Sequence, residues 1–129
     1  MPSVDVVDEM FLVAPRSEIA AIFADPVTQR RIWPDLRLTV YADRGDEGLR
    51  WTVQGALVGT MEVWLEQVLD GTVLHYFLRA DPPGPTGEPA PLPPKIAIRE
   101  SRRRQLLARA AFFQLKQRLE MGREIGCPP

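Results

Sequence analysis

Three side chains in the middle of the chain have types that could carry acid–base chemistry: Arg50, Glu66 and His75. They belong to the stretch RWTVQGALVGTMEVWLEQVLDGTVLHYFLRADP, in which polar and apolar residues alternate. A carboxylate next to a histidine stabilises the charged imidazole and fixes its tautomer, as a proton-transfer catalyst requires. The competing interpretation is a set of exposed cross-strand ion pairs, each worth less than about 1 kcal/mol. The pattern favours ion pairs, because the three residues share the face opposite to the apolar one, but it leaves the acid–base alternative open.

Turn signals set the predicted register of this stretch. Asp70-Gly71 suits the tip of a two-residue hairpin, and residues 57–59 suit a three-residue loop with Gly59 in the left-handed position. These turns place five pairs opposite each other: Glu66 and His75, Trp64 and Phe77, Glu62 and Arg79, Arg50 and Glu66, and Thr52 and Trp64. Opposite charges meet in these registers, which supports a two-faced antiparallel sheet.

The segments around this stretch predict the elements that must position it. Residues 3–13 alternate as a strand, and residues 14–25 place apolar side chains at helical spacing. Asp25-Pro26 suits the start of a second short helix, which ends near Ile32 because Pro34 follows. Further alternating segments predict strands at 35–43, 48–56, 60–68 and 72–80.

The C-terminal part contains a proline-rich loop and then a long helix. Residues 81–95 hold seven prolines, which exclude regular helix or strand. A surface spacer is favoured there over a docking segment for a proline-reading partner. Residues 96–123 predict one helix, with an apolar stripe and a second, flanking stripe formed by Leu106, Ala110 and Phe113. The apolar stripe consists of Leu107, Ala108, Ala111, Phe112, Leu115 and Leu119.

Charge is distributed unevenly along the chain. Residues 1–90 hold 14 acidic and 7 basic side chains, and residues 91–129 hold 3 acidic and 9 basic ones. The arginines at 102–104 lie early in the predicted helix, where the helix dipole disfavours cations. We therefore expect them to meet acidic groups of the same protein rather than nucleic acid.

The order of these elements resembles the helix-grip fold of the START-like superfamily. The residues that carry the resemblance are VDVVDEMFLVAPRSEIAAIFADP with RRIWPDL, GLRWTVQGALVGTMEVWLE, DGTVLHYFLRADP and LKQRLEMGR. They look like small actinobacterial members of the polyketide cyclase/dehydrase and lipid-transport branch. The resemblance implies one α+β domain over residues 1–129, a curved antiparallel sheet wrapped on the long C-terminal helix. Members of that family usually have six or seven strands, whereas this chain predicts about five, with the proline-rich loop in place of a hairpin.

The resemblance also implies a ligand cavity between the sheet and the C-terminal helix. Apolar residues of the inner sheet face and the helix would line it, and aromatic and methionine side chains suit an apolar ligand. Phe23 and Trp33 would lie near its mouth. The full set of expected ligand-binding residues is Phe23, Trp33, Leu38, Trp51, Val53, Met61, Val63, Tyr76, Leu78, Phe112 and Leu115.

Three functions remain open on these grounds. The first is binding of a hydrophobic small molecule such as a lipid, polyketide or aromatic metabolite. The second is a cyclase or dehydratase that uses His75 as acid or base. The third is a non-catalytic, dimeric interaction module with an empty or collapsed cavity. It would assemble through the polar sheet face, where Tyr41, Trp64 and Phe77 would supply the contact, or through the proline-rich loop.

Several other classes of site lack residues to support them. One histidine and one cysteine, Cys127, offer no metal-ligand spacing and no disulfide framework, so we expect no metal and no cofactor. No apolar run reaches the length of a membrane span, and the N-terminal residues do not resemble a signal peptide. We expect a cytoplasmic protein.

Overall fold

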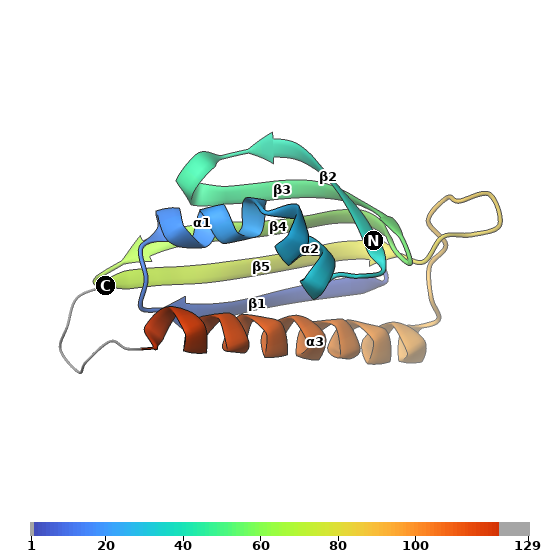
Figure 1. Cartoon of the computed structure of the whole chain (residues 1–129). Coiled ribbons are helices and arrows are strands. Elements are labelled where there is room, and N and C mark those ends of the chain that lie inside the picture. Colours follow the sequence, from blue (N-terminus) through green and yellow to red (C-terminus); the bar gives the residue numbers. More distant parts are fainter. Residues whose placement is uncertain (1, 122–129) are drawn as a thin grey trace.

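The computed structural model describes residues 2–121, whose arrangement Figure 1 shows. The elements, in order, are β1 (Val4–Leu12), α1 (Arg16–Ala24), α2 (Pro26–Ile32), β2 (Leu36–Asp43), the 3-10 helix η1 (Gly45–Glu47), β3 (Gly48–Gly55), β4 (Val58–Val68), β5 (Gly71–Asp81) and α3 (Pro94–Glu120). The predicted architecture of five strands, two short helices after the first strand and a long C-terminal helix is confirmed. The predicted helix boundary at residue 123 and Cys127 lie outside the described residues.

The strands form one antiparallel sheet in the order β1-β5-β4-β3-β2. Figure 1 shows α1 and α2 over one face of this sheet and α3 running alongside β1. The inner sheet face, α1 and α3 therefore enclose a common core between them. None of the described helices combines the length and apolar character needed to cross a membrane.

Alternation explains why this face of the sheet is apolar. Along β4 and β5, every second side chain is buried, among them Met61, Val63, Tyr76 and Leu78. Edge strand β2 is less buried: Val40 pairs with the buried Trp51 but is itself 45% exposed at the edge of the sheet. A bulge between Val40 and Ala42 then interrupts the pairing of β2 with β3.

Local signals in the two short helices agree with the structure. Ile19 and Phe23 are the buried residues of α1. The backbone N–H of Val27 donates to Oδ1 of Asp25 at 2.9 Å, and Pro26 follows this cap as the first residue of α2. The Asp25 cap thus sets the point at which the chain turns from α1 into α2.

The turn between β4 and β5 lies one residue earlier than predicted. Val68 pairs with Gly71, so that Leu69 and Asp70 form the tip, with Leu69 at a φ of 54°. A Cβ on Gly71 would lie 2.4 Å from the carbonyl oxygen of Leu12, so this glycine permits close packing against β1 instead of forming the turn. The predicted pairs of this hairpin are therefore wrong by two positions: Trp64 lies opposite His75, Glu62 opposite Phe77 and Thr60 opposite Arg79.

The register of β3 and β4 also differs from the prediction, by four positions. Arg50 lies opposite Glu62 rather than Glu66, and Thr52 lies opposite Thr60 rather than Trp64. Gly55, at a φ of 112°, takes the left-handed conformation predicted for Gly59. Both shifts are even, so every side chain keeps its predicted face.

Helix α3 buries only one of the two predicted apolar stripes. Its buried residues include Arg104, Ala108, Phe112 and Leu115. The flanking stripe is exposed: Leu106 is 53% and Phe113 51% accessible, and Leu107 of the main stripe is 52% accessible. The second stripe suggests a helix that is buried on more than one side, and this expectation is wrong, because α3 packs along a single edge of the sheet.

The segment between Asp81 and Pro94 folds into a compact loop that projects from the body (Figure 1). Pro83 and Pro89 form an isolated bridge, and the N–H of Ala90 donates to the carbonyl oxygen of Pro82 at 2.8 Å. At the base of the loop, the N–H of Leu92 donates to Oγ of Ser3 at 3.1 Å. These contacts fix where the chain enters α3.

Candidate functional site

An aromatic cluster fills the space between the sheet and α3. Trp33 lies at its centre, with ring centroids 5.9 Å from both Trp51 and Tyr76 and 6.3 Å from Phe112. The ring of Phe23 lies 5.7 Å from that of Phe112. These separations are those of rings in direct contact, so the inner face of the sheet is packed where the sequence predicts a cavity.

The polar atoms within this cluster are mostly satisfied by one another. The indole N–H of Trp33 donates to the hydroxyl of Tyr76 at 3.2 Å, and that hydroxyl lies 3.5 Å from Sδ of Met61. Burial raises the pKa of Tyr76, so its phenol remains protonated. Among the described residues, Nε1 of Trp51 is buried without a hydrogen-bond partner.

The residues expected to bind ligand are brought together, but as core. Leu38 is half-buried, and the others are buried: Phe23, Trp33, Trp51, Val53, Met61, Val63, Tyr76, Leu78, Phe112 and Leu115. Phe23 and Trp33 both lie within the aromatic cluster, at 1% and 3% exposure, and of the two Trp33 also borders open space. Open space is found beside this cluster instead.

A groove runs between α2 and α3, and we refer to it as the α2–α3 groove. It consists of two adjoining hollows of about 440 and 490 Å³ that share Arg31, Ile32, Ala111 and Gln114. The first hollow is also lined by Ile22, Thr28, Leu115, Gln117, Arg118 and Met121. The second is also lined by Trp33, Pro34, Asp35, Arg103, Arg104, Leu107, Ala108 and Ala110.

The small residues of α3 account for the width of the groove. Ala108, Ala110 and Ala111 present only methyl groups to the second hollow, so α2 and α3 do not close over it. Trp33 and Ala108, both buried in the core, form part of its floor. The groove is therefore apolar at its base and adjoins the aromatic cluster through Trp33.

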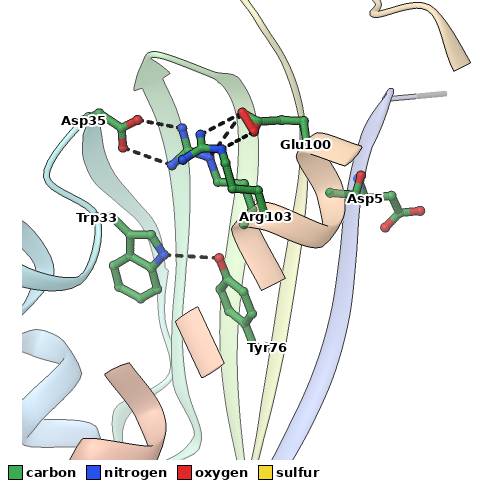
Figure 2. Close-up of polar contacts among 8 residues, drawn as sticks. Asp5, Trp33, Asp35, Tyr76, Glu100 and Arg103 are labelled. Atoms are coloured by element: carbon green, nitrogen blue, oxygen red, sulfur yellow. Dashed lines mark hydrogen bonds and ion pairs between the residues drawn. The ribbon is translucent and has the colours of Figure 1, made fainter. Parts of the chain in front are cut away.

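A buried arginine lines the second hollow of the groove. Arg104, whose side chain is 6% exposed, donates to both carboxylate oxygens of Asp35 at 3.0 and 2.6 Å. Glu100 accepts two hydrogen bonds from Arg103 and lies 3.8 Å from Nε of Arg104. Figure 2 shows Asp35, Arg103 and Glu100 gathered next to the Trp33–Tyr76 pair. The expectation that this arginine run meets acidic groups of the protein is confirmed for Arg103 and Arg104.

These contacts determine the ionisation of the two carboxylates. The hydrogen bonds from Arg104 hold the pKa of Asp35 below its ordinary value, against the opposing effect of partial burial. The hydrogen bonds from Arg103 likewise lower the pKa of Glu100. Both groups are thus anions at neutral pH and serve as counterions of the two arginines.

The acid–base candidates lie on the outer face of the sheet, in two separate groups. Nε2 of His75 lies 3.0 Å from Oε1 of Glu66, Nδ1 lies 3.5 Å from Oε2 of Glu9, and the imidazole stacks on Trp64 with a centroid distance of 4.4 Å. Glu66 reaches His75 diagonally rather than from the opposite position. Arg50 instead bonds Glu62 at 3.0 Å, together with Arg44. The predicted Arg50–Glu66 contact is replaced by Arg50–Glu62.

Of the groove residues on α2 and α3, sequence reasoning identified Leu115 as ligand-binding and placed Ala108 and Ala111 in the apolar stripe. Arg31 and Arg118 gave no signal, because a groove depends on the spacing of two helices that the sequence does not specify. Arg104 gave a partial signal, because it belongs to the run of arginines at 102–104 for which acidic partners were expected; the structure places it in the middle of α3 rather than near its start. The sequence around Asp35, which directly follows Pro34, gave no sign that this residue pairs with an arginine.

Similar folds occur among solved structures. A protein of Deinococcus radiodurans, DR_A0006, matches with a TM-score of 0.63 at 15% identity, over 92% of this chain and 98% of its own. The Aha1 dimer from Colwellia psychrerythraea matches with a TM-score of 0.63 at 12% identity, over 94% and 99%. Protein Ms6760 from Mycobacterium smegmatis matches with a TM-score of 0.59 at 14% identity, over 94% of both chains. The chain has the helix-grip fold.

The sequence itself has no such match: no protein-family model and no curated protein matches the chain. At these identities, the structural neighbours inform on the fold alone.

Proposed function

We propose that the chain binds a hydrophobic small molecule, such as a lipid, a polyketide or an aromatic metabolite, in the α2–α3 groove. The observation that carries this proposal is the floor of the groove, where Trp33, Ala108 and Leu115 belong both to the buried core and to the lining. Each hollow has the volume of a small-molecule site, about 300–1,000 Å³. An apolar ligand there would cover core residues that now border water.

The position of the groove supports the resemblance to ligand carriers. The predicted cavity residues lie directly behind Trp33, so a ligand in the groove would contact the outer surface of the same cluster. The small actinobacterial type of the polyketide cyclase/dehydrase and lipid-transport branch, and a cytoplasmic location, remain predictions of the sequence.

A fluorescence titration with N-phenylnaphthylamine, an uncharged apolar probe, tests the proposal. We expect saturable binding at about micromolar affinity, which corresponds to about −8 kcal/mol. Ala111→Trp should weaken binding at least tenfold, because Ala111 lines both hollows and an indole would fill them. Leu106→Trp is the matched control, since Leu106 lies on the same helix, is exposed and does not line the groove.

Two results would contradict the proposal. One is the absence of saturable binding to the folded wild-type protein. The other is equal binding by wild-type protein and the Ala111→Trp variant, with circular dichroism showing that the variant is folded. The second result would place the probe elsewhere on the molecule.

The cyclase or dehydratase alternative has weaker support. His75 would be its acid or base, but His75 is held between Glu9 and Glu66 on the outer face of the sheet. None of the described residues lining the α2–α3 groove is a histidine. Binding without catalysis is therefore the function that the geometry favours.

A homodimer through the outer sheet face is a separate proposal. Tyr41 is 54% and Val7 58% exposed on this face, and Trp64 is half-buried under His75. Trp64→Ala should weaken such a dimer, because aromatic residues dominate the energetics of interfaces. Sedimentation equilibrium of wild-type protein and this variant measures the effect, and a wild-type protein that is monomeric at all concentrations would exclude the dimer.

A further inference from the structure

The α2–α3 groove concentrates positive charge in a protein that is acidic overall. The whole chain has a formal net charge of −1. Of the described residues that line the groove, Arg31, Arg103, Arg104 and Arg118 are basic, and Asp35 alone is acidic. This excess of cations is not required by the hydrophobic function proposed above, so it calls for its own explanation.

The four arginines divide into two pairs with different surroundings. Arg103 and Arg104 are neutralised by Glu100 and Asp35, as described above. Arg31 and Arg118 make no hydrogen bond or ion pair with any of the described residues. Both of them line the 440 Å³ hollow, to which the described chain contributes no acidic side chain.

The remaining lining of this hollow suits an amphipathic molecule. Ile22, Ile32, Leu115 and Met121 provide apolar contact. A guanidinium group donates two parallel hydrogen bonds to a planar oxyanion and keeps its charge at all relevant pH values. Arg31 comes from α2 and Arg118 from α3, so an oxyanion between them would be held from both walls of the groove.

Resting on the proposed function, we propose that the ligand of the α2–α3 groove is an apolar molecule with an acidic oxyanion head group, held by Arg31 and Arg118. The apolar body would lie along Ala111 and Leu115 toward the floor at Trp33. Binding would then neutralise the two arginines that have no counterion in the described part of the chain.

Two probes of nearly identical shape test this proposal. Anilinonaphthalene sulfonate is N-phenylnaphthylamine with one added sulfonate group, so the ratio of their dissociation constants isolates the contribution of the anion. We expect the wild-type protein to bind the sulfonate about tenfold more tightly at low ionic strength. That preference should decrease as salt is added, because added ions screen exposed charges.

The double variant Arg31→Gln/Arg118→Gln should lose this preference and keep its affinity for the uncharged probe. Arg30→Gln/Arg102→Gln is the matched control. It removes the same charge from the same two helices, at exposed residues outside the groove lining that also lack partners among the described residues. Competition with aliphatic ligands gives a second measurement: decanoate should displace the uncharged probe at about tenfold lower concentration than decanol.

The possible outcomes separate this proposal from the one on which it rests. If the uncharged probe does not bind, or binds unchanged to Ala111→Trp, both proposals fail. If it binds in the groove but the sulfonate binds no better, or both double variants lose the preference equally, only the acidic head group is excluded. Loss of the preference in Arg31→Gln/Arg118→Gln alone would establish the site.

Discussion

Arg104 and Asp35 form a two-point contact that joins the middle of α3 to the turn after α2. Nη1 of Arg104 lies 3.0 Å from Oδ1 of Asp35, and Nη2 lies 2.6 Å from Oδ2. The arginine side chain is 6% exposed and the aspartate side chain 45%. Because Arg104 is buried and Asp35 is not, we expect the loss of Asp35 and the loss of Arg104 to lower stability by different amounts.

Removal of the aspartate should be the more damaging change. Asp35→Ala leaves a buried guanidinium with Glu100 as its nearest anion, and we expect the free energy of unfolding to fall by about 2–4 kcal/mol. Arg104→Met removes the buried charge and should cost less. Urea unfolding measures both, with Asp46→Ala, an exposed aspartate, as a control expected within about 0.5 kcal/mol of wild type. An equal cost for Asp35→Ala and Asp46→Ala would show that the pair does not contribute to stability.

The same pair predicts how stability depends on pH. Hydrogen bonds from Arg104 lower the pKa of Asp35 in the folded protein, so its contribution is fully present above the pKa of the unfolded state. It is lost as the pH falls through the lower, folded pKa, that is, below about pH 4. We expect the midpoint temperature of thermal unfolding to decrease as the pH is lowered below about 4. In the Asp35→Asn variant this decrease should be less steep. An identical pH dependence in this variant would contradict the assignment.

Trp51 should be the most sensitive position in the sheet. Its side chain is fully buried and packs against Trp33, so Trp51→Ala should cost about 3–5 kcal/mol of unfolding free energy. Trp51→Phe should cost only about 1–2 kcal/mol, because the indole nitrogen has no hydrogen-bond partner among the described residues to lose. Guanidinium unfolding measures the loss of stability in both variants. If Trp51→Phe lost as much as Trp51→Ala, the expectation that the indole nitrogen makes no stabilising hydrogen bond would be wrong.

His75 should prove to be a structural partner of Glu9 and Glu66. We expect His75→Gln to change stability by about 1 kcal/mol, as for a partly exposed hydrogen bond or ion pair. Affinity for N-phenylnaphthylamine should be unchanged, because His75 lies on the sheet face opposite to the core. A loss of binding or of turnover in this variant, with the fold intact, would favour the enzyme hypothesis instead.

The sequence was sufficient to predict which face of each strand is buried, but not which residues lie opposite each other. Alternation in β4 and β5 depends only on local side-chain types, and it placed Met61 and Tyr76 correctly. Register depends on tertiary contacts of glycines: Gly71 lies against the carbonyl oxygen of Leu12, and Gly59 lies against that of Arg79. Neither contact is visible in a turn motif.

The candidate site was predictable only in its apolar part. Trp33, Tyr76 and Phe112 were expected near the ligand, and they form the cluster beside the groove. Whether aromatic side chains enclose a cavity or fill it depends on ring geometry, which composition does not determine. Arg31 and Arg118 of the groove could not be found, because their role depends on the separation of two helices.

The pairing of the first strand with the fifth also bears on the order of folding. Strands β2 to β5 follow one another as neighbours, so their pairing requires only short loops to close. In contrast, Val4 pairs with Ala80, and β1 is then covered by α3. Contacts so distant in sequence form slowly. We therefore expect the meander β2–β5 to form early and β1 to dock late, so that native-state hydrogen exchange should show β1 and α3 opening together before the central strands.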